Sequence, residues 1–195
     1  MASAVRWILD FEGYQIHSFF YPIEIGLLSL QNNDLCYEWR IKYESVAFSN
    51  RTTRWQHNQH ALGWKHGNKD LHVALTEIRK VINDYNNDSE LPTMTSPQHI
   101  IYVKGFEKAN WIKRWFQDSC NIIVEQIHGA PSFRDLSMFY GAMYACIYHR
   151  DAFHLRCARK KVYQLLPYCT TTEFDDNSIA TTTAAVQKLC IDSCQ

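Results

Sequence analysis

Two cysteines and a histidine in the last third of the chain have the residue types and spacing of metal ligands. Cys146, His149 and Cys157 form the pattern C-x2-H-x7-C. Thiolate and imidazole groups are the donors that a tetrahedral zinc ion prefers, and a C-x2-H pair can bind from a single turn. A structural site needs a fourth ligand, and the nearest candidate along the chain is His154. The pattern therefore predicts a zinc site; the alternative is two core cysteines beside a buried histidine.

Three acidic residues indicate a different chemistry. Asp10 and Glu12 lie two residues apart at the end of a predicted strand, so their side chains should face the same side. Glu107 lies at the start of a predicted helix. Carboxylates from several segments hold Mg²⁺ or Mn²⁺ in two-metal nucleases. The alternatives are an Asx-type turn at Asp10, an exposed Glu12, and a Glu107 that complements the dipole of its helix.

The segment 49–68 combines cations with aromatic rings, as do surfaces that bind single-stranded nucleic acid. The candidate residues are Arg51, Arg54, Trp55, His57, Trp64 and Lys65. The alternative is an ordered loop with a short helix, whose tryptophans help to close the core. A second basic run, Arg156 with residues 159–161, is predicted to be a solvated helix face.

The elements that must position these residues alternate between strand and helix patterns. Three strands are expected to form an antiparallel sheet, over residues 5–10, 23–30 and 35–43. Downstream, a helix is predicted over 71–86 with Asp70 as its cap, followed by a right-handed parallel crossover of strand 99–103, helix 106–116 and strand 121–124. Two further helices are predicted, over 136–144 and from about Leu155 to Pro167, then a Thr-rich loop over 170–183. Residues 184–191 are expected to form either a helical turn or a frayed tail.

Composition limits the function classes. Lys and Arg number 20 and Asp and Glu number 20, so nucleic-acid binding would need a local basic patch rather than a basic domain. Seven cysteines, an odd number, and an N-terminus without a signal-peptide pattern predict an intracellular protein, cytoplasmic or nuclear. No apolar run approaches the roughly 18 residues of a membrane span, so no membrane partner is predicted. The expected organisation is one domain over residues 1–168 and a polar tail over 169–195.

The acidic motifs resemble those of the DEDD-type exonucleases of the ribonuclease H-like fold. Leu9-Asp10-Phe11-Glu12 resembles their first motif, and Val103–Lys108 resembles their second, with Glu107 at the aspartate position. Their last helix carries an Asp-Ala pair where this chain has Cys157-Ala158, and their catalytic histidine corresponds to Ala152. The resemblance implies an α/β fold with a mixed sheet of about five strands, lacking the fourth catalytic acid.

Maelstrom domains, which act in the piRNA pathway of animal germ cells, show the same departure. They keep this fold but replace the catalytic acids with a Glu-Cys-His-Cys zinc set, which Glu24 followed by Cys146, His149 and Cys157 resembles over roughly residues 1–166. The resemblance implies Glu24 as the fourth zinc ligand, with His154 as its rival. Unlike Maelstrom domains, this chain keeps Asp10 and Glu12.

Three functional hypotheses follow from these patterns. The first is a degenerate exonuclease-fold domain, stabilised by zinc, that binds single-stranded or structured RNA in transposon or small-RNA control. The second is a nuclease that uses Asp10, Glu12 and Glu107 with Mg²⁺ or Mn²⁺. The third is a scaffold for protein partners that does not contact nucleic acid.

Overall fold

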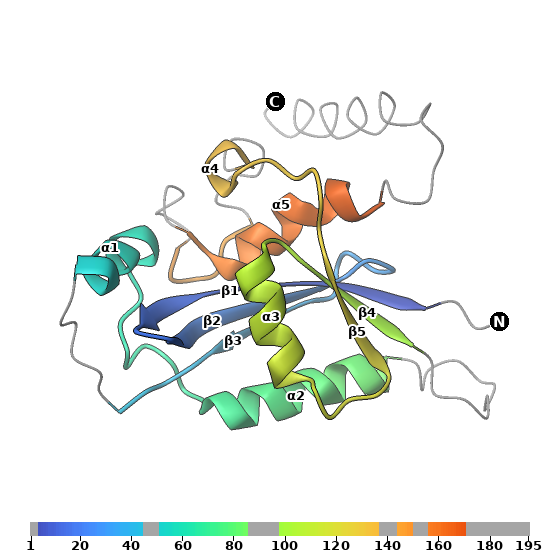
Figure 1. Cartoon of the computed structure of the whole chain (residues 1–195), viewed down its shortest axis with the longest axis horizontal. Coiled ribbons are helices and arrows are strands. Elements are labelled where there is room, and N and C mark those ends of the chain that lie inside the picture. Colours follow the sequence, from blue (N-terminus) through green and yellow to red (C-terminus); the bar gives the residue numbers. More distant parts are fainter. Residues whose placement is uncertain (1–3, 45–50, 86–97, 137–143, 150–155, 171–195) are drawn as a thin grey trace.

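The chain folds around a five-stranded mixed sheet that carries helices on both faces (Figure 1). The computed structural model describes residues 4–44, 51–85, 98–136, 144–149 and 156–170. The strands are β1 (Val5–Ile16), β2 (Phe19–Ser29), β3 (Cys36–Arg40), β4 (His99–Val103) and β5 (Ile122–Gln126). The helices are α1 (Arg51–His60), α2 (Leu71–Asp84), α3 (Phe106–Trp115), α4 (Phe133–Leu136) and α5 (Ala158–Thr170).

The strand order is β3-β2-β1-β4-β5. The first three strands are antiparallel, whereas β4 is parallel to both β1 and β5, with α3 as the crossover between β4 and β5. The α/β class, the antiparallel beginning and the parallel crossover predicted from the sequence are therefore confirmed. Only Val5–Ile8 of β1 pair with β4, so the second half of β1 has β2 as its one sheet neighbour in the described structure.

Successive side chains of β1 point to opposite faces of the sheet, so β1 contributes to the core on both faces. Trp7, Leu9 and Phe11 point to the face covered by α2 and α3, where they pack in the larger apolar cluster. Ile8 points to the opposite face and packs against Val162 of α5. Asp10 and Glu12 continue the series of Ile8, so both carboxylates lie on the α5 face.

The beginning of α5 lies very close to β2. A Cβ atom added to Gly26 would lie 2.9 Å from the backbone carbonyl carbon of Ala158, which is closer than real Cβ contacts. The glycine therefore lets the first turn of α5 approach the sheet, which places Cys157 over β2. Ala158, Val162 and Leu165 are fully buried, as the helical spacing predicted.

The short helix expected within residues 49–68 is present as the ten-residue helix α1. Two sequence predictions need correction. Strand β1 continues to Ile16, so Asp10 lies inside a strand and not in a turn. The predicted stop at Pro167 is wrong, because α5 runs to Thr170: a proline in the last turn removes a single helical hydrogen bond, and Cys169 of that turn is buried in the core.

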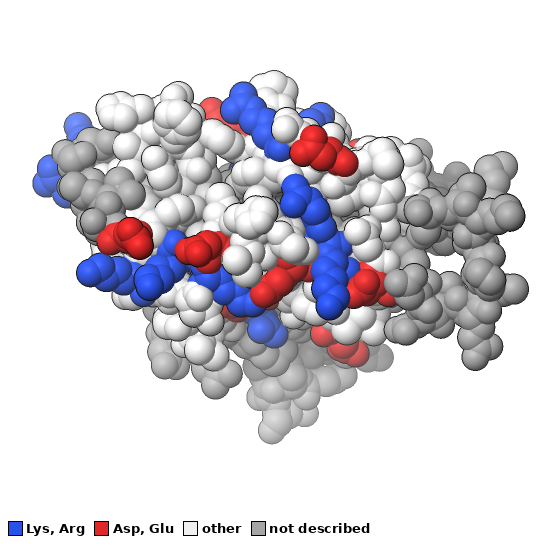
Figure 2. Space-filling view, turned by 90° about the horizontal axis from the view of Figure 1, so that it is seen from below, with Lys and Arg blue, Asp and Glu red and all other residues white. Residues whose placement is uncertain are grey.

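Other predictions lie outside the described residues. These are the body of the helix over 136–144, residue His154, the loop over 170–183 and the turn over 184–191. Among the helices that are described, none is both long and apolar enough to cross a membrane. On the face shown in Figure 2, basic side chains lie among acidic ones, as the zero net charge leads one to expect.

Candidate metal centre

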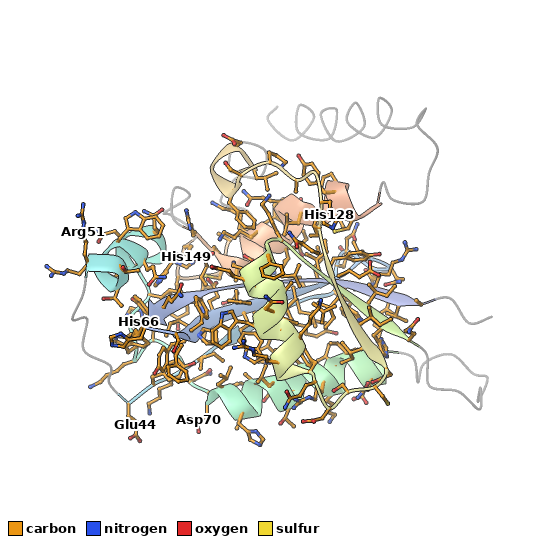
Figure 3. All side chains as sticks on the ribbon, in the orientation of Figure 1. Glu44, Arg51, His66, Asp70, His128 and His149 are labelled. Atoms are coloured by element: carbon orange, nitrogen blue, oxygen red, sulfur yellow. The ribbon has the colours of Figure 1, made fainter. Side chains whose placement is uncertain are left out.

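Four potential ligands from distant parts of the chain meet on the α5 face of the sheet. Glu24 comes from β2, Cys146 and His149 from the segment 144–149, and Cys157 from the position just before α5. All four are buried, with at most 1% of each residue exposed. Figure 3 shows His149 between α1 and α5. The structure thus brings together the four residues that the sequence had grouped.

The donor atoms have distances that suit one metal ion. One donor atom from each residue lies within 4.8 Å of the other three. Cys146 Sγ lies 3.0 Å from His149 Nδ1, and Cys157 Sγ lies 3.4 Å from Glu24 Oε1. Zinc bonds of about 2.0–2.3 Å in a tetrahedron separate donor atoms by about 3.3–3.8 Å. The cluster, called the metal cluster below, therefore needs only small displacements to surround an ion.

One ring nitrogen of the histidine in the metal cluster is bonded to a backbone group. His149 Nε2 lies 2.5 Å from the carbonyl oxygen of His60, the last residue of α1. Since a carbonyl oxygen only accepts, Nε2 carries a proton, and Nδ1, on the side of Cys146, is the nitrogen that could bind a metal. Metal-bound histidines commonly use such a second hydrogen bond for orientation.

The carboxylate of Glu24 divides its two oxygens between the helix and the metal cluster. Oε2 accepts a hydrogen bond of 3.0 Å from the backbone N–H of Ala158, the first residue of α5. A carboxylate at a helix N-terminus is favoured by the unpaired N–H groups and by the dipole. Oε1 is the oxygen that faces Cys157 and His149.

A buried arginine borders the metal cluster. Arg40 on β3 pairs in register with Glu24, and its Nη2 contacts Cys146 Sγ and lies 3.2 Å from Glu24 Oε1. Its guanidinium also lies over the ring of Tyr148, 4.2 Å from the centroid. With both cysteines as thiolates, the metal cluster and Arg40 together carry a formal charge of −2, because three negative groups face one positive group. A divalent cation would neutralise the site.

The thiol of Cys157 needs a cation to ionise. A hydrogen bond with Cys146 and the burial of the sulfur raise the pKa of Cys157 far above its usual range. Without a metal, this thiol keeps its proton at neutral pH. Binding of a metal ion therefore releases a proton, as in other thiolate sites.

A second cluster lies beside the first on the same face. It consists of Asp10, Glu12, Lys108 and Lys161, and is called the charge cluster below. Lys108 Nζ lies 2.6 Å from Asp10 Oδ1, while Lys161 forms an ion pair with Glu12 and lies 3.7 Å from Asp10 Oδ2. Each carboxylate of this cluster thus has an ammonium group as its partner. Burial lowers the pKa of Lys161, and the neighbouring Asp10 opposes this shift.

The two clusters share one arrangement, in which a strand carboxylate faces a residue at the start of α5. Glu12 and Glu24 are directly opposite each other on β1 and β2. Above them, Cys157 and Lys161 are four residues apart at the beginning of α5, a spacing that places side chains about 5–6 Å apart on one helix face. Cys157 therefore lies over Glu24, and Lys161 lies over Glu12. Each of the two carboxylates thus has a partner of its own.

Glu107, the third predicted catalytic acid, does not belong to either cluster. It is exposed in the first turn of α3. It lines the same pocket as Glu12, but Lys108 and Lys161 line that pocket too. Its position is that of an acid that complements the helix dipole.

The predicted nucleic-acid residues are divided by burial. Arg51, Arg54, Trp55 and Lys65 are exposed, and Arg51 points away from the molecule at the outer end of α1 (Figure 3). Trp64 is a correction: it is only 5% exposed, in a small core with Tyr14, and has no ring face for a base. His57 is half-buried and its Nδ1 lies 2.8 Å from the Tyr14 hydroxyl, so it supports the attachment of α1.

Sequence reasoning missed Arg40, Lys108 and Lys161 as parts of these clusters. Lys161 had one signal, its spacing of four residues from Cys157 on a predicted helix. Arg40 had none, because its contact depends on the register of β3 against β2. The five cysteines in the described ranges are all free of disulfides.

No protein-family model matches this chain, and no curated protein matches it either. The reasons for assigning the metal cluster are therefore its donor atoms, their distances and their burial.

Proposed function

We propose that this protein is a zinc-stabilised domain with a degenerate exonuclease-like fold, and that it binds RNA without cutting it. The observation that carries the proposal is the buried metal cluster of one carboxylate, two sulfurs and one imidazole. Two thiolates and an imidazole favour zinc over the hard cations Mg²⁺ and Ca²⁺. Four protein ligands fill a tetrahedral ion completely, so the ion has a structural role and holds no reactive water.

The charge cluster supports the absence of cutting. A two-metal nuclease needs carboxylates that are available to cations. Here Asp10 and Glu12 already have Lys108 and Lys161 as partners, and Lys161 is almost fully buried. A metal ion would have to displace a buried ammonium group. We therefore propose a ribonuclease H-like fold in which the two lysines occupy the place of the cations of an ancestral catalytic site.

RNA is the proposed partner because of the surface of α1. Arg51, Arg54 and Trp55 are exposed there, and Arg156 lies over the Trp55 ring at 5.3 Å. Cations beside an exposed ring suit an unpaired nucleic-acid strand. With the resemblance to Maelstrom domains, this supports a role in small-RNA or transposon control.

Two measurements on the purified protein test the proposal. Elemental analysis is expected to find about one zinc per chain, and absence of any bound metal after zinc-supplemented expression would contradict the structural site. Filter binding of labelled single-stranded RNA over a salt titration is expected to show affinity that falls with salt. No retention at low salt would contradict the RNA-binding part while leaving the zinc site intact.

A further inference from the structure

A pocket of about 230 Å³ opens between α1, β1 and α3, beside the charge cluster. Its lining includes the aromatic residues Trp55 of α1 and Trp111 of α3, together with the buried Phe11 of β1. Trp55 is 52% exposed, so part of its ring is open to a ligand. Pockets for drug-sized ligands measure about 300–1,000 Å³. This one has room for a single planar ring system.

One cation of the pocket lining favours a ligand with an attached anion. Aromatic rings often enclose a cation, but these rings already have cations from the chain itself. Lys108 lies 4.9 Å from the centroid of Phe11, and Arg156 lies 5.3 Å from that of Trp55. Lys161 also lines the pocket. Lys108 and Lys161 are paired with Asp10 and Glu12, and Glu12 and Glu107 also line the pocket. Arg156, beside the Trp55 ring, is the cation of the lining that lies outside the charge cluster, and it would attract an anion attached to a flat ring.

Polar groups at the pocket suit the edge of a nucleobase. Gln56 on α1 lines the pocket, and its Oε1 accepts a hydrogen bond of 3.0 Å from the backbone N–H of Gln15. This bond orients the amide, whose nitrogen carries two further donors. Gln59, one turn later on α1, lines the pocket as well. Amide side chains beside aromatic rings are a common means of binding unstacked bases.

We infer that this pocket binds one unstacked nucleotide of an RNA strand, with its base against Trp55 and Trp111 and its phosphate beside Arg156. The inference rests on the RNA-binding function proposed above and assigns it a specific site. Exposed Arg51 and Arg54 on the same helix extend the cationic surface beyond the pocket, where flanking phosphates of a chain would lie. A free nucleotide would not use them.

The test measures binding of a fluorescent single-stranded RNA of about ten nucleotides, within the usual site size of such proteins. Trp55→Ala is expected to weaken binding about tenfold, since one base–aromatic stack is lost. Phe19→Ala is the matched control, because Phe19 is also an exposed ring (63%) and lies outside the pocket lining. It is expected to leave the affinity unchanged. Thermal melts of both variants verify that they fold as the wild type does.

A scan with one abasic position in the RNA makes the test specific for a single base. If one base enters the pocket, removing that base from the RNA weakens binding to the wild type about as much as Trp55→Ala does. The same abasic RNA should then bind the Trp55→Ala variant no more weakly than the intact RNA does. A flat scan, or equal RNA affinity of wild type and Trp55→Ala, overturns the inference but not RNA binding. No RNA binding by wild type overturns both. Competition by free AMP or UMP at the concentrations at which RNA binds would reassign the pocket to free nucleotides.

Discussion

The metal cluster and the charge cluster use the same arrangement of backbone but reach neutrality by different means. Each brings a strand carboxylate next to a residue at the start of α5: Glu24 next to Cys157, just before the helix, and Glu12 next to Lys161 in its first turn. In the charge cluster, two carboxylates face two ammonium groups, so the formal charges balance within the chain. In the metal cluster, the ligands with Arg40 keep a formal charge of −2 once both thiols ionise.

This difference indicates which cluster depends on an external ion. Burying uncompensated charge is costly, so an isolated cluster of charge −2 requires either protons or a divalent cation. The charge cluster has no such requirement. A chelator is therefore expected to affect the metal cluster and to leave the charge cluster unchanged, although the two lie on the same sheet face.

The largest effect is expected from loss of a thiolate. Cys157→Ser should remove zinc binding and lower the free energy of unfolding by at least about 4 kcal/mol, because metal binding is coupled to folding. Chemical denaturation with and without a chelator measures this. Cys120→Ser is the control, since Cys120 is exposed and free. Equal loss of stability in both variants, or a chelator without effect on the wild type, would contradict a structural metal ion.

The next largest effect is expected from removal of a buried ammonium group. Lys161→Met leaves Glu12 without its nearest cation and Asp10 with Lys108 alone, and should cost about 3–5 kcal/mol of stability. Lys113→Met, at an exposed position of α3, is the control. Adding Mn²⁺ should recover part of the stability of Lys161→Met, because the freed carboxylates can then hold a cation.

Neither the Lys113 variant nor the wild type should respond to Mn²⁺ in this way. A Lys161→Met protein as stable as wild type would show that the charge cluster contributes no net stability, and would weaken the contrast between the two sites.

A smaller effect on stability is expected when the pH is lowered. Burial lowers the pKa of His99, which is 1% exposed on β4, below its ordinary value of 6.5. The folded state therefore keeps His99 neutral while the unfolded chain takes up a proton below pH 6.5. Stability should fall with decreasing pH below that value, by up to about 1.4 kcal/mol per unit until the folded protein also protonates.

The variant His99→Leu should show a shallower loss of stability below pH 6.5 than wild type. His72→Gln, at an exposed position of α2, should not change the slope. The remaining acid sensitivity of His99→Leu then reports on the other buried groups, which are the metal cluster and His60, whose pKa burial lowers to about 3. Identical slopes for His99→Leu and wild type would contradict a lowered pKa.

The smallest effect is expected at Glu107. Glu107→Gln should change stability by no more than about 0.5 kcal/mol and leave the zinc content unchanged, because the residue is exposed and belongs to neither cluster. Incubation of wild type with RNA and Mn²⁺ should yield no cleavage. Cleavage that disappears in Glu107→Gln would instead support a catalytic role for this acid and reverse the interpretation of the charge cluster.

The sequence predicted features that depend on local patterns better than features that depend on contacts between distant segments. The strand and helix order and the grouping of Cys146, His149 and Cys157 depend on short-range periodicity and spacing, and both agree with the structure. Glu24 could be named only through a family resemblance, because its place in the metal cluster depends on strand register and on the approach of α5 at Gly26.

The same limit explains the failures. Trp55 and Trp64 have similar polar neighbours in the sequence, yet one is half exposed on α1 and the other is buried beside Tyr14. Lys161 appeared as part of a solvated basic face, but the helix turns it toward Glu12. A charged residue is buried only where an opposite charge from a distant segment meets it, and composition alone does not contain that information.

The contact between Glu24 and Cys157 joins residues 133 positions apart. A contact of this range forms late when a chain is synthesised from its N-terminus, so a metal ion at Glu24 could gain its full set of ligands only after Cys157 has been synthesised. Truncated chains that end before Cys157 are thus expected to bind no zinc, which would link metal occupancy to completion of the domain.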